Sequence, residues 1–281
     1  MKKNKFLFCI GLLLTVATIV NAQSVTWISS TEGNVWQKSK VKLQSKSEQN
    51  PVLQVDGTEN GVAFKNWGTT FNELCWDALG LLTRTEQDEI LYNIFSPQGD
   101  LRITRGRISM GANDYARSWY SCDEVEGDFE LRYFNINRDK QTIIPFIRAA
   151  QKYNPNLTFW ISPWCPPSWM KINGDYPVLS SPFNSLSEKQ NYLLYGATGG
   201  QVDENEMKLT GARDGVFPRQ LATTDFMIQD PRYLQTYADY FCRFIDAYKE
   251  QGIPIDMVMY QNEAYSYTPY PGCAWTAAGT I

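Results

Sequence analysis

The residues best suited to chemistry stand at the end of a short apolar run near residue 260. Ile255–Tyr260 follows Gly252 and is typical of a buried strand. It leads directly into Gln261-Asn262-Glu263, two amides followed by a carboxylic acid. If the strand belongs to a β/α barrel, Glu263 lies at the mouth where the catalytic groups of such barrels gather. Its carboxyl group could then serve as a general acid, or it could simply cap a helix or pair with a cation.

The composition restricts which reactions are possible. The 281 residues include no histidine, which excludes a Ser-His-Asp triad, a Cys-His pair and His-ligated metal sites within the chain. Acid–base catalysis must therefore rest mainly on carboxylates. No glycine-rich phosphate loop follows the first predicted strand, and we expect no cofactor and no metal. The formal charge of −4 and the lack of a basic cluster beyond the N-terminus argue against a nucleic-acid partner.

Further polar and aromatic side chains follow the other predicted strands. Asn72 and Glu73 follow the first strand, Arg107 and Asp114 belong to the end of the second, and Trp164 follows the third. Because parallel strands end at the same edge of a sheet, we expect these side chains to share one pocket with the carboxyl group described above. An aspartate can accept sugar hydroxyls, and an indole can cover the apolar face of a sugar ring. Each also has a structural explanation: an ion pair for Arg107, a turn for Asp114 and core packing for Trp164.

Strand and helix patterns alternate from residue 61 onward. We predict strands at 61–64, 101–108, 157–161 and 255–260, and helices after Thr83, over 138–153 and after Asp230. This alternation predicts an α/β fold with a parallel sheet, either a (β/α)8 barrel or a doubly wound sheet. The missing phosphate loop favours the barrel. The section at 163–229 is too long for a simple connector and could be a lid, an insertion or a substrate-binding loop.

The N-terminal residues 1–22 have the pattern of a secretory signal peptide. A basic start is followed by the apolar run Phe6–Val20 and by Ala22, after which we expect cleavage. An apolar run of about 15 residues is short for a membrane span. We therefore expect an exported protein, periplasmic or extracellular, with no stable membrane anchor. Residues 23–60 alternate apolar and polar side chains between turn signals, which predicts short β-strands that need a partner layer.

Three motifs resemble glycoside hydrolase family 30, which holds the glucosylceramidases and the microbial endo-β-1,6-glucanases. In chain order they are Arg107–Asp114, Ser162–Trp164 with Trp169–Lys171, and Gln261–Glu263. The similarity runs from about residue 64 to the last residue and is interrupted between 184 and 222. The resemblance implies an α/β fold, a (β/α)8 TIM barrel. Residues 61–281 would be its N-terminal part, about the first four β/α units, and residues 23–60 would belong to a side β-sandwich.

The same resemblance implies a retaining hydrolase that acts on β-glucosides. By matching motifs, Glu263 takes the general acid/base role and Asn262 contacts the sugar 2-hydroxyl. Asp114 and Trp164 would line the subsite for the glycone, and Arg107 would support the catalytic carboxylates. Retention requires a second carboxylate about 5 Å from the first. The family places this nucleophile on strand seven, whereas this chain stops after strand four, so we expect a truncated enzyme that is inactive alone.

Two other hypotheses stay open from the sequence. The chain could be a non-catalytic carbohydrate-binding remnant that keeps the glycone subsite. Alternatively, Glu73 and Glu263 could form a different catalytic carboxylate pair. The substrate could be a lipid-linked glucoside, β-1,6-glucan or another β-glycoside, and the sequence does not choose among them.

Overall fold

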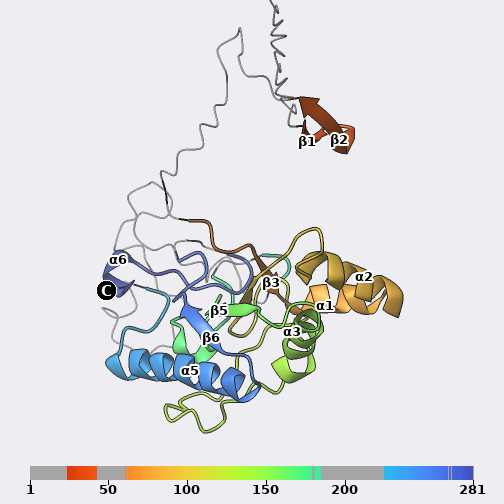
Figure 1. Cartoon of the computed structure of the whole chain (residues 1–281). Helices are drawn as coiled ribbons and strands as arrows, with labels where there is room; N and C mark the ends of the chain where they lie inside the picture. Colours follow the sequence, from red (N-terminus) through yellow and green to blue (C-terminus); the bar gives the residue numbers. More distant parts are fainter. Residues whose placement is uncertain are drawn as a thin grey trace, which may run out of the picture. The chain divides into compact units, whose positions relative to one another are not determined.

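The computed structural model describes residues 24–42, 61, 63–178, 181–184, 225–264, 266 and 268–280 (Figure 1). The chain divides into two compact units, residues 1–63 and residues 64–281. The predicted signal peptide at 1–22 lies outside the described residues. So does the predicted insertion between 184 and 222, apart from Asn184 itself.

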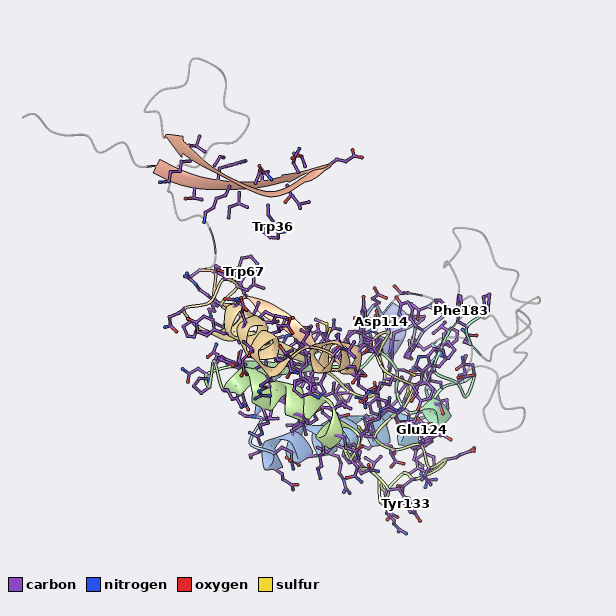
Figure 2. All side chains as sticks on the ribbon, turned by 90° about the vertical axis from the view of Figure 1, so that its right-hand side faces the viewer. Trp36, Trp67, Asp114, Glu124, Tyr133 and Phe183 are labelled. Atoms are coloured by element: carbon purple, nitrogen blue, oxygen red, sulfur yellow. The ribbon has the colours of Figure 1, made fainter. Side chains whose placement is uncertain are left out.

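The first unit contains an antiparallel hairpin of β1 (Ser24–Thr31) and β2 (Asn34–Lys42). Gly33 takes a φ of +75° in the turn, a conformation that glycine adopts without strain. The hairpin exposes its aromatic side chains, and Trp36 is 76% exposed (Figure 2). A lone hairpin is marginally stable in water, which agrees with the expected need for a partner layer. Its membership of a side β-sandwich stays a prediction.

The second unit is built on a four-stranded parallel sheet. Its strands are β3 (Gly68–Phe71), β4 (Arg105–Ser109), β5 (Thr158–Ser162) and β6 (Ile255–Val258). They pair in the order β3-β4-β5-β6, so every strand neighbours the next one in the chain. A doubly wound sheet reverses its order at a switch point, whereas a barrel does not. The order of these four strands therefore agrees with the predicted α/β barrel class.

Helices connect the strands and cover one face of the sheet. The helical elements are α1 (Glu73–Gly80), α2 (Arg84–Phe95), η1 (Asp139–Gln141), α3 (Ile143–Gln151), η2 (Ser168–Met170), α5 (Pro231–Glu250) and α6 (Ala277–Thr280). Helix α5 runs beside β5 and β6, and α1, α2 and α3 gather near β3 (Figure 1). Within the described ranges, no helix is long and apolar enough to cross a membrane.

Local sequence signals explain where the predicted helices begin. Thr83 accepts a hydrogen bond from the backbone of Glu86, whose side chain bonds the Thr83 backbone in return, as predicted for a capping box. Asp230 caps α5 by accepting from the Arg232 backbone N–H. Pro145 occurs in the first turn of α3, where its missing N–H costs nothing.

The sheet separates an apolar face from a polar one. Phe71, Ile108 and Ile161 are register neighbours, and each is fully buried against the helices. Gly106 lies beneath Phe71 and Phe159, and an added Cβ would approach their rings to 2.5 and 2.8 Å. Side chains alternate along a strand, so Arg107 points away from this core, to the opposite face.

Three predictions about strands were wrong in detail. The first strand is Gly68–Phe71 and not 61–64, because pairing with β4 places it there. The second strand begins at Arg105, four residues after the predicted start. The last strand, β6, was expected to be buried, yet Met257 and Val258 are 43% and 48% exposed. In the described part of the chain, β6 pairs with β5 alone.

Candidate active site

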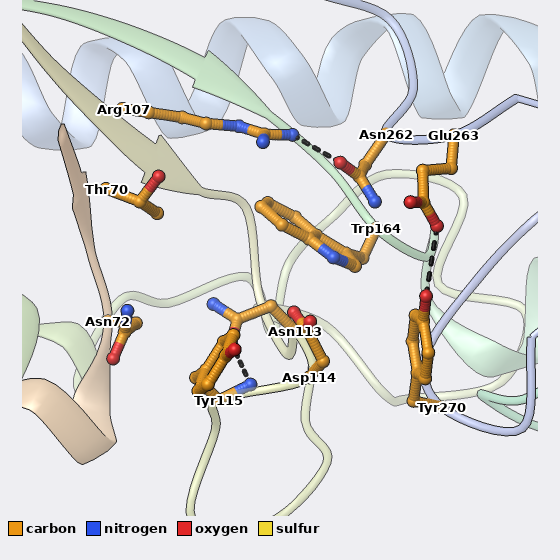
Figure 3. Close-up of a pocket in the computed structure, with 10 residues that line it drawn as sticks. All are labelled: Thr70, Asn72, Arg107, Asn113, Asp114, Tyr115, Trp164, Asn262, Glu263 and Tyr270. Carbon is orange, nitrogen blue, oxygen red and sulfur yellow. Dashed lines mark hydrogen bonds between the residues drawn. The ribbon is translucent and has the colours of Figure 1, made fainter. Parts of the chain in front are cut away.

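All five predicted site residues line one pocket at the C-terminal edge of the sheet (Figure 3). The cavity has a volume of about 260 Å³. Its lining residues are Thr70, Asn72, Arg107, Asn113, Asp114, Tyr115, Trp164, Asn262, Glu263 and Tyr270. The side chains come from β3, β4 and the segments that follow all four strands, which is where β/α barrels place their active sites.

Arg107 forms the rear of the pocket. Its Nη2 atom donates to Oγ of Ser162 and to Oδ1 of Asn262, each at 2.7 Å. Its guanidinium carbon lies 4.0 Å from the ring centre of Trp164 and 4.9 Å from that of Trp160. Burial lowers the pKa of Arg107, while the carboxylates of Asp114 and Glu263 oppose that shift. The guanidinium thus provides a fixed positive charge near both acids.

Trp164 is more deeply buried than we expected for a residue that stacks against a sugar ring. It is only 6% exposed, and the Arg107 guanidinium covers its ring. A stacked cation of this kind orients the guanidinium as much as it shapes the pocket. Trp164 lines the cavity, yet much of its surface packs against protein.

Hydrogen bonds orient Asn262. Its backbone N–H donates to the carbonyl of Pro163 at 2.8 Å, and Gln261 donates from Nε2 to the carbonyl of Trp164 at 2.7 Å. These bonds join the end of β6 to the segment after β5. Because Arg107 donates to the Asn262 oxygen, the amide nitrogen is on the pocket side (Figure 3). This nitrogen could donate to a sugar hydroxyl.

Glu263 extends into the pocket from an unusual backbone conformation. Its φ is +48°, in the left-handed region that non-glycine residues seldom adopt. The residue is exposed, and its Oε2 accepts a 3.0 Å hydrogen bond from the hydroxyl of Tyr270. Burial, followed by the nearby Glu263 carboxylate, raises the pKa of Tyr270, so this hydroxyl stays a donor at neutral pH. A solvent-accessible carboxyl group with one positioned donor suits proton transfer.

Asp114 lies exposed on the opposite side of the pocket (Figures 2 and 3). The preceding Asn113 is buried, with Nδ2 donating to Ser109 and Oδ1 accepting from the Tyr115 backbone at 2.7 Å. This local turn fixes the backbone on both sides of Asp114. The pocket therefore has an acceptor carboxylate facing the side that carries Asn262 and Glu263.

Glu73 does not belong to this pocket, which contradicts the hypothesis of a Glu73–Glu263 pair. Glu73 is 1% exposed, and its two carboxylate oxygens accept from Arg138 at 2.8 and 2.6 Å. Burial alone would raise the pKa of Glu73, but the hydrogen bonds from Arg138 and from the Arg117 backbone lower it overall. A buried, ion-paired carboxylate outside the cavity serves structure.

Tyr270 is the principal site residue that sequence reasoning missed. It follows the strand end by several residues, in a segment rich in tyrosine and proline that offered no spacing signal. Thr70 was also not predicted, because its strand was placed too early. Asn113 and Tyr115 stand within or beside a motif that the sequence did single out, although no role was assigned to them.

The fold and the pocket define a β/α-barrel domain with carboxylates and aromatic side chains at the C-terminal ends of its strands. Residues 64–181 match the glycosyl hydrolase family 30 TIM-barrel domain. The predicted resemblance to that family is confirmed over these residues.

Two curated relatives and one solved structure are similar to this chain. The chain is 27% identical over 250 residues to a putative glucosylceramidase 4 of Caenorhabditis elegans, covering 88% of this chain and 40% of the relative. It is 26% identical over 231 residues to an endo-1,6-β-D-glucanase of Aspergillus fumigatus, covering 80% and 40%. The fold is similar to that of a solved endo-β1,6-glucanase, with a TM-score of 0.54 and 23% identity over 76% of this chain and 38% of that one. The chain thus spans about two-fifths of the length of these proteins.

Proposed function

We propose that the protein containing this chain hydrolyses β-glucosides with retention of anomeric configuration. Glu263 would protonate the leaving oxygen as general acid and then deprotonate the attacking water as general base. Asn262 would contact the sugar 2-hydroxyl, and Asp114 and Trp164 would line the glycone subsite. Arg107 would orient Asn262 and offset the negative charge of the carboxylates.

One observation supports this proposal most strongly: the Asn262–Glu263 pair lies in the same pocket as Asp114. Asn262 is held by Arg107, whereas Glu263 is exposed and its carboxyl group accepts a hydrogen bond from the Tyr270 hydroxyl. The pocket thus pairs a rigid donor with an accessible acid. The exposed Asp114 adds an acceptor at the opposite wall.

Retention requires a second carboxylate as nucleophile, about 5 Å from the first. We propose that this group comes from strand seven of the barrel, as the family resemblance implies. The described residues form four parallel strands, and that strand is not among them. We therefore expect residues 23–281 alone to bind a glucoside without turning it over.

The test follows the anomer first released by the full-length protein from p-nitrophenyl β-D-glucoside, using proton NMR. The β-anomer should appear before mutarotation. First release of the α-anomer would contradict retention, and an absence of hydrolysis of aryl β-glucosides, gentio-oligosaccharides and glucosylceramide would contradict the proposed activity.

A non-catalytic carbohydrate-binding remnant is the second candidate, because all four proposed sugar-binding residues already line the pocket. Saturable binding of a glucoside by the full-length protein, with no turnover of any of these substrates, would favour that reading. Turnover would reject it.

We also propose that the protein is exported through cleavage after Ala22. The support is the order of basic, apolar and small residues in 1–22, which lie outside the described structure. N-terminal sequencing of protein recovered from the periplasm or the medium should begin at Gln23. A cytoplasmic product that keeps Met1 or Lys2 would contradict export.

A further inference from the structure

The loop from Gly111 to Tyr120, here called the Asp114 loop, is closed at its base. The backbone N–H of Ala112 donates to the carbonyl of Tyr120 at 2.8 Å. Gly111 takes a φ of +82°, and an added Cβ would lie 2.9 Å from the Tyr120 oxygen, so this close approach needs glycine. A group that holds Tyr120 therefore holds the base of the loop that carries Asp114.

A buried carboxyl group outside the pocket, Asp139, accepts a hydrogen bond from Tyr120. The Tyr120 hydroxyl donates to Oδ1 of Asp139 at 2.6 Å, and the Tyr248 hydroxyl donates to Oδ2 at 2.7 Å. Asp139 has no exposed surface. Tyr248 belongs to the last turn of α5, the helix that leads into β6. One carboxyl group thus joins the Asp114 loop to α5, the helix that precedes β6 and the segment with Asn262 and Glu263.

Arg138 adds a second contact to the same part of the loop. Its guanidinium carbon lies 4.1 Å from the ring centre of Tyr120, and Nη2 donates to the Ser118 carbonyl at 2.9 Å. Arg138 is itself held by the buried Glu73, which also accepts from the Arg117 backbone N–H at 2.8 Å. The C-terminal part of the loop, from Arg117 to Tyr120, therefore contacts charged groups that are themselves held in place, which favours one loop conformation.

We propose that Tyr120 is a positioning residue, whose bond to Asp139 holds the Asp114 loop in the conformation that lines the sugar pocket. Tyr120 does not itself line the cavity. Its effect on a ligand must therefore pass through the loop. The part of the proposal that concerns sugar binding rests on the proposed function, whereas the clamp on the loop does not.

The two tyrosines provide a matched pair of variants. Tyr120→Phe and Tyr248→Phe each remove one hydroxyl donor from the same carboxyl group, but only Tyr120 belongs to the loop. Hydrogen–deuterium exchange of the full-length protein should show faster exchange of the Ala112 and Arg117 amides in Tyr120→Phe, by about tenfold, the equivalent of about 1.4 kcal/mol for one lost hydrogen bond. Tyr248→Phe should leave these amides unchanged. Equal acceleration in both variants would overturn the proposal.

Steady-state kinetics supply the functional readout. With p-nitrophenyl β-D-glucoside, Tyr120→Phe should raise KM with a smaller change in kcat, because Asp114 is displaced and Glu263 is not. Tyr248→Phe should leave KM unchanged, and an equal rise in both variants would count against the proposal.

If the unmodified protein neither binds nor hydrolyses the glucoside, the proposed function fails, and the exchange comparison still decides whether Tyr120 holds the loop. If Tyr120→Phe does not fold, Asp139→Asn weakens the same bond, and unchanged exchange in the loop would then overturn the proposal.

Discussion

The hydroxyl of Tyr270 donates a 3.0 Å hydrogen bond to Oε2 of Glu263, which lies in the segment that follows β6. Both residues line the same pocket, and they lie seven positions apart in the chain. A donor at this distance restricts the orientation of the carboxyl group. Tyr270 therefore helps to position Glu263 for proton transfer within the pocket.

Replacement of Tyr270 by Phe should lower kcat roughly tenfold, because the Glu263 carboxyl group loses the hydrogen bond that orients it. Steady-state kinetics with p-nitrophenyl β-D-glucoside measure this change. The kcat of Tyr133→Phe, a change at an exposed tyrosine outside the pocket, should match that of the unmodified protein. An unchanged kcat in Tyr270→Phe would show that the hydroxyl does not act on Glu263.

The buried Asp139 should make stability depend on pH. Burial raises its pKa to about 6, despite the hydrogen bonds from Tyr120 and Tyr248 that lower it. Its ordinary value of 3.8 applies in the unfolded chain, so between pH 4 and 6 the folded protein binds more protons. Asp139 therefore contributes on the order of 3 kcal/mol to the free energy of unfolding. This contribution is complete below about pH 4 and is lost as pH rises through about 6.

Urea unfolding at several pH values measures this contribution. Unfolding free energy should fall between pH 4.5 and 7, and Asp139→Asn should flatten the decline. Glu73 acts in the opposite direction, because its lowered pKa gives stability that is lost as pH falls. A decline as steep in Asp139→Asn as in the unmodified protein would rule Asp139 out as its source.

Gly106→Ala should destabilise the second unit by about 1–3 kcal/mol, the usual cost of overpacking a core. The new methyl group would meet the rings of Phe71 and Phe159 at 2.5 and 2.8 Å. Gly80→Ala is the control, because an added Cβ there has no neighbour within 4 Å. The thermal unfolding midpoint of Gly106→Ala should be lower than that of Gly80→Ala. Equal midpoints would mean that the rings of Phe71 and Phe159 move aside without loss of stability.

The sequence predicted those parts of the fold that depend on local signals. The capping box at Thr83 and the Asp230 cap of α5 act within four residues, so their patterns were sufficient. The first strand was misplaced because two short segments looked alike, and only pairing between Gly68 and Arg105 decides between them. The exposure of Met257 was equally unpredictable, since an apolar run indicates a strand but not what packs on it.

The candidate site was predictable to the extent that it follows from topology. Asp114, Asn262 and Glu263 converge because parallel strands end at one edge. Tyr270 depends instead on long-range contacts, such as the bond from the Gly272 N–H to the Tyr176 carbonyl. Glu73 is excluded by its pairing with Arg138, which is 65 residues away and leaves no trace in local spacing.

The most direct test of the central claim is azide rescue of Glu263→Gln in the full-length protein, with 2,4-dinitrophenyl β-D-glucoside as substrate. This leaving group needs no acid, so the glycosyl-enzyme should still form, while its hydrolysis, which needs the base, should slow by about 10²–10⁴-fold. Azide needs no deprotonation and should restore turnover, giving β-D-glucosyl azide. Full activity in Glu263→Gln without azide, or failure of azide to rescue a folded variant that still binds the substrate, would contradict the assignment of Glu263 as general acid/base.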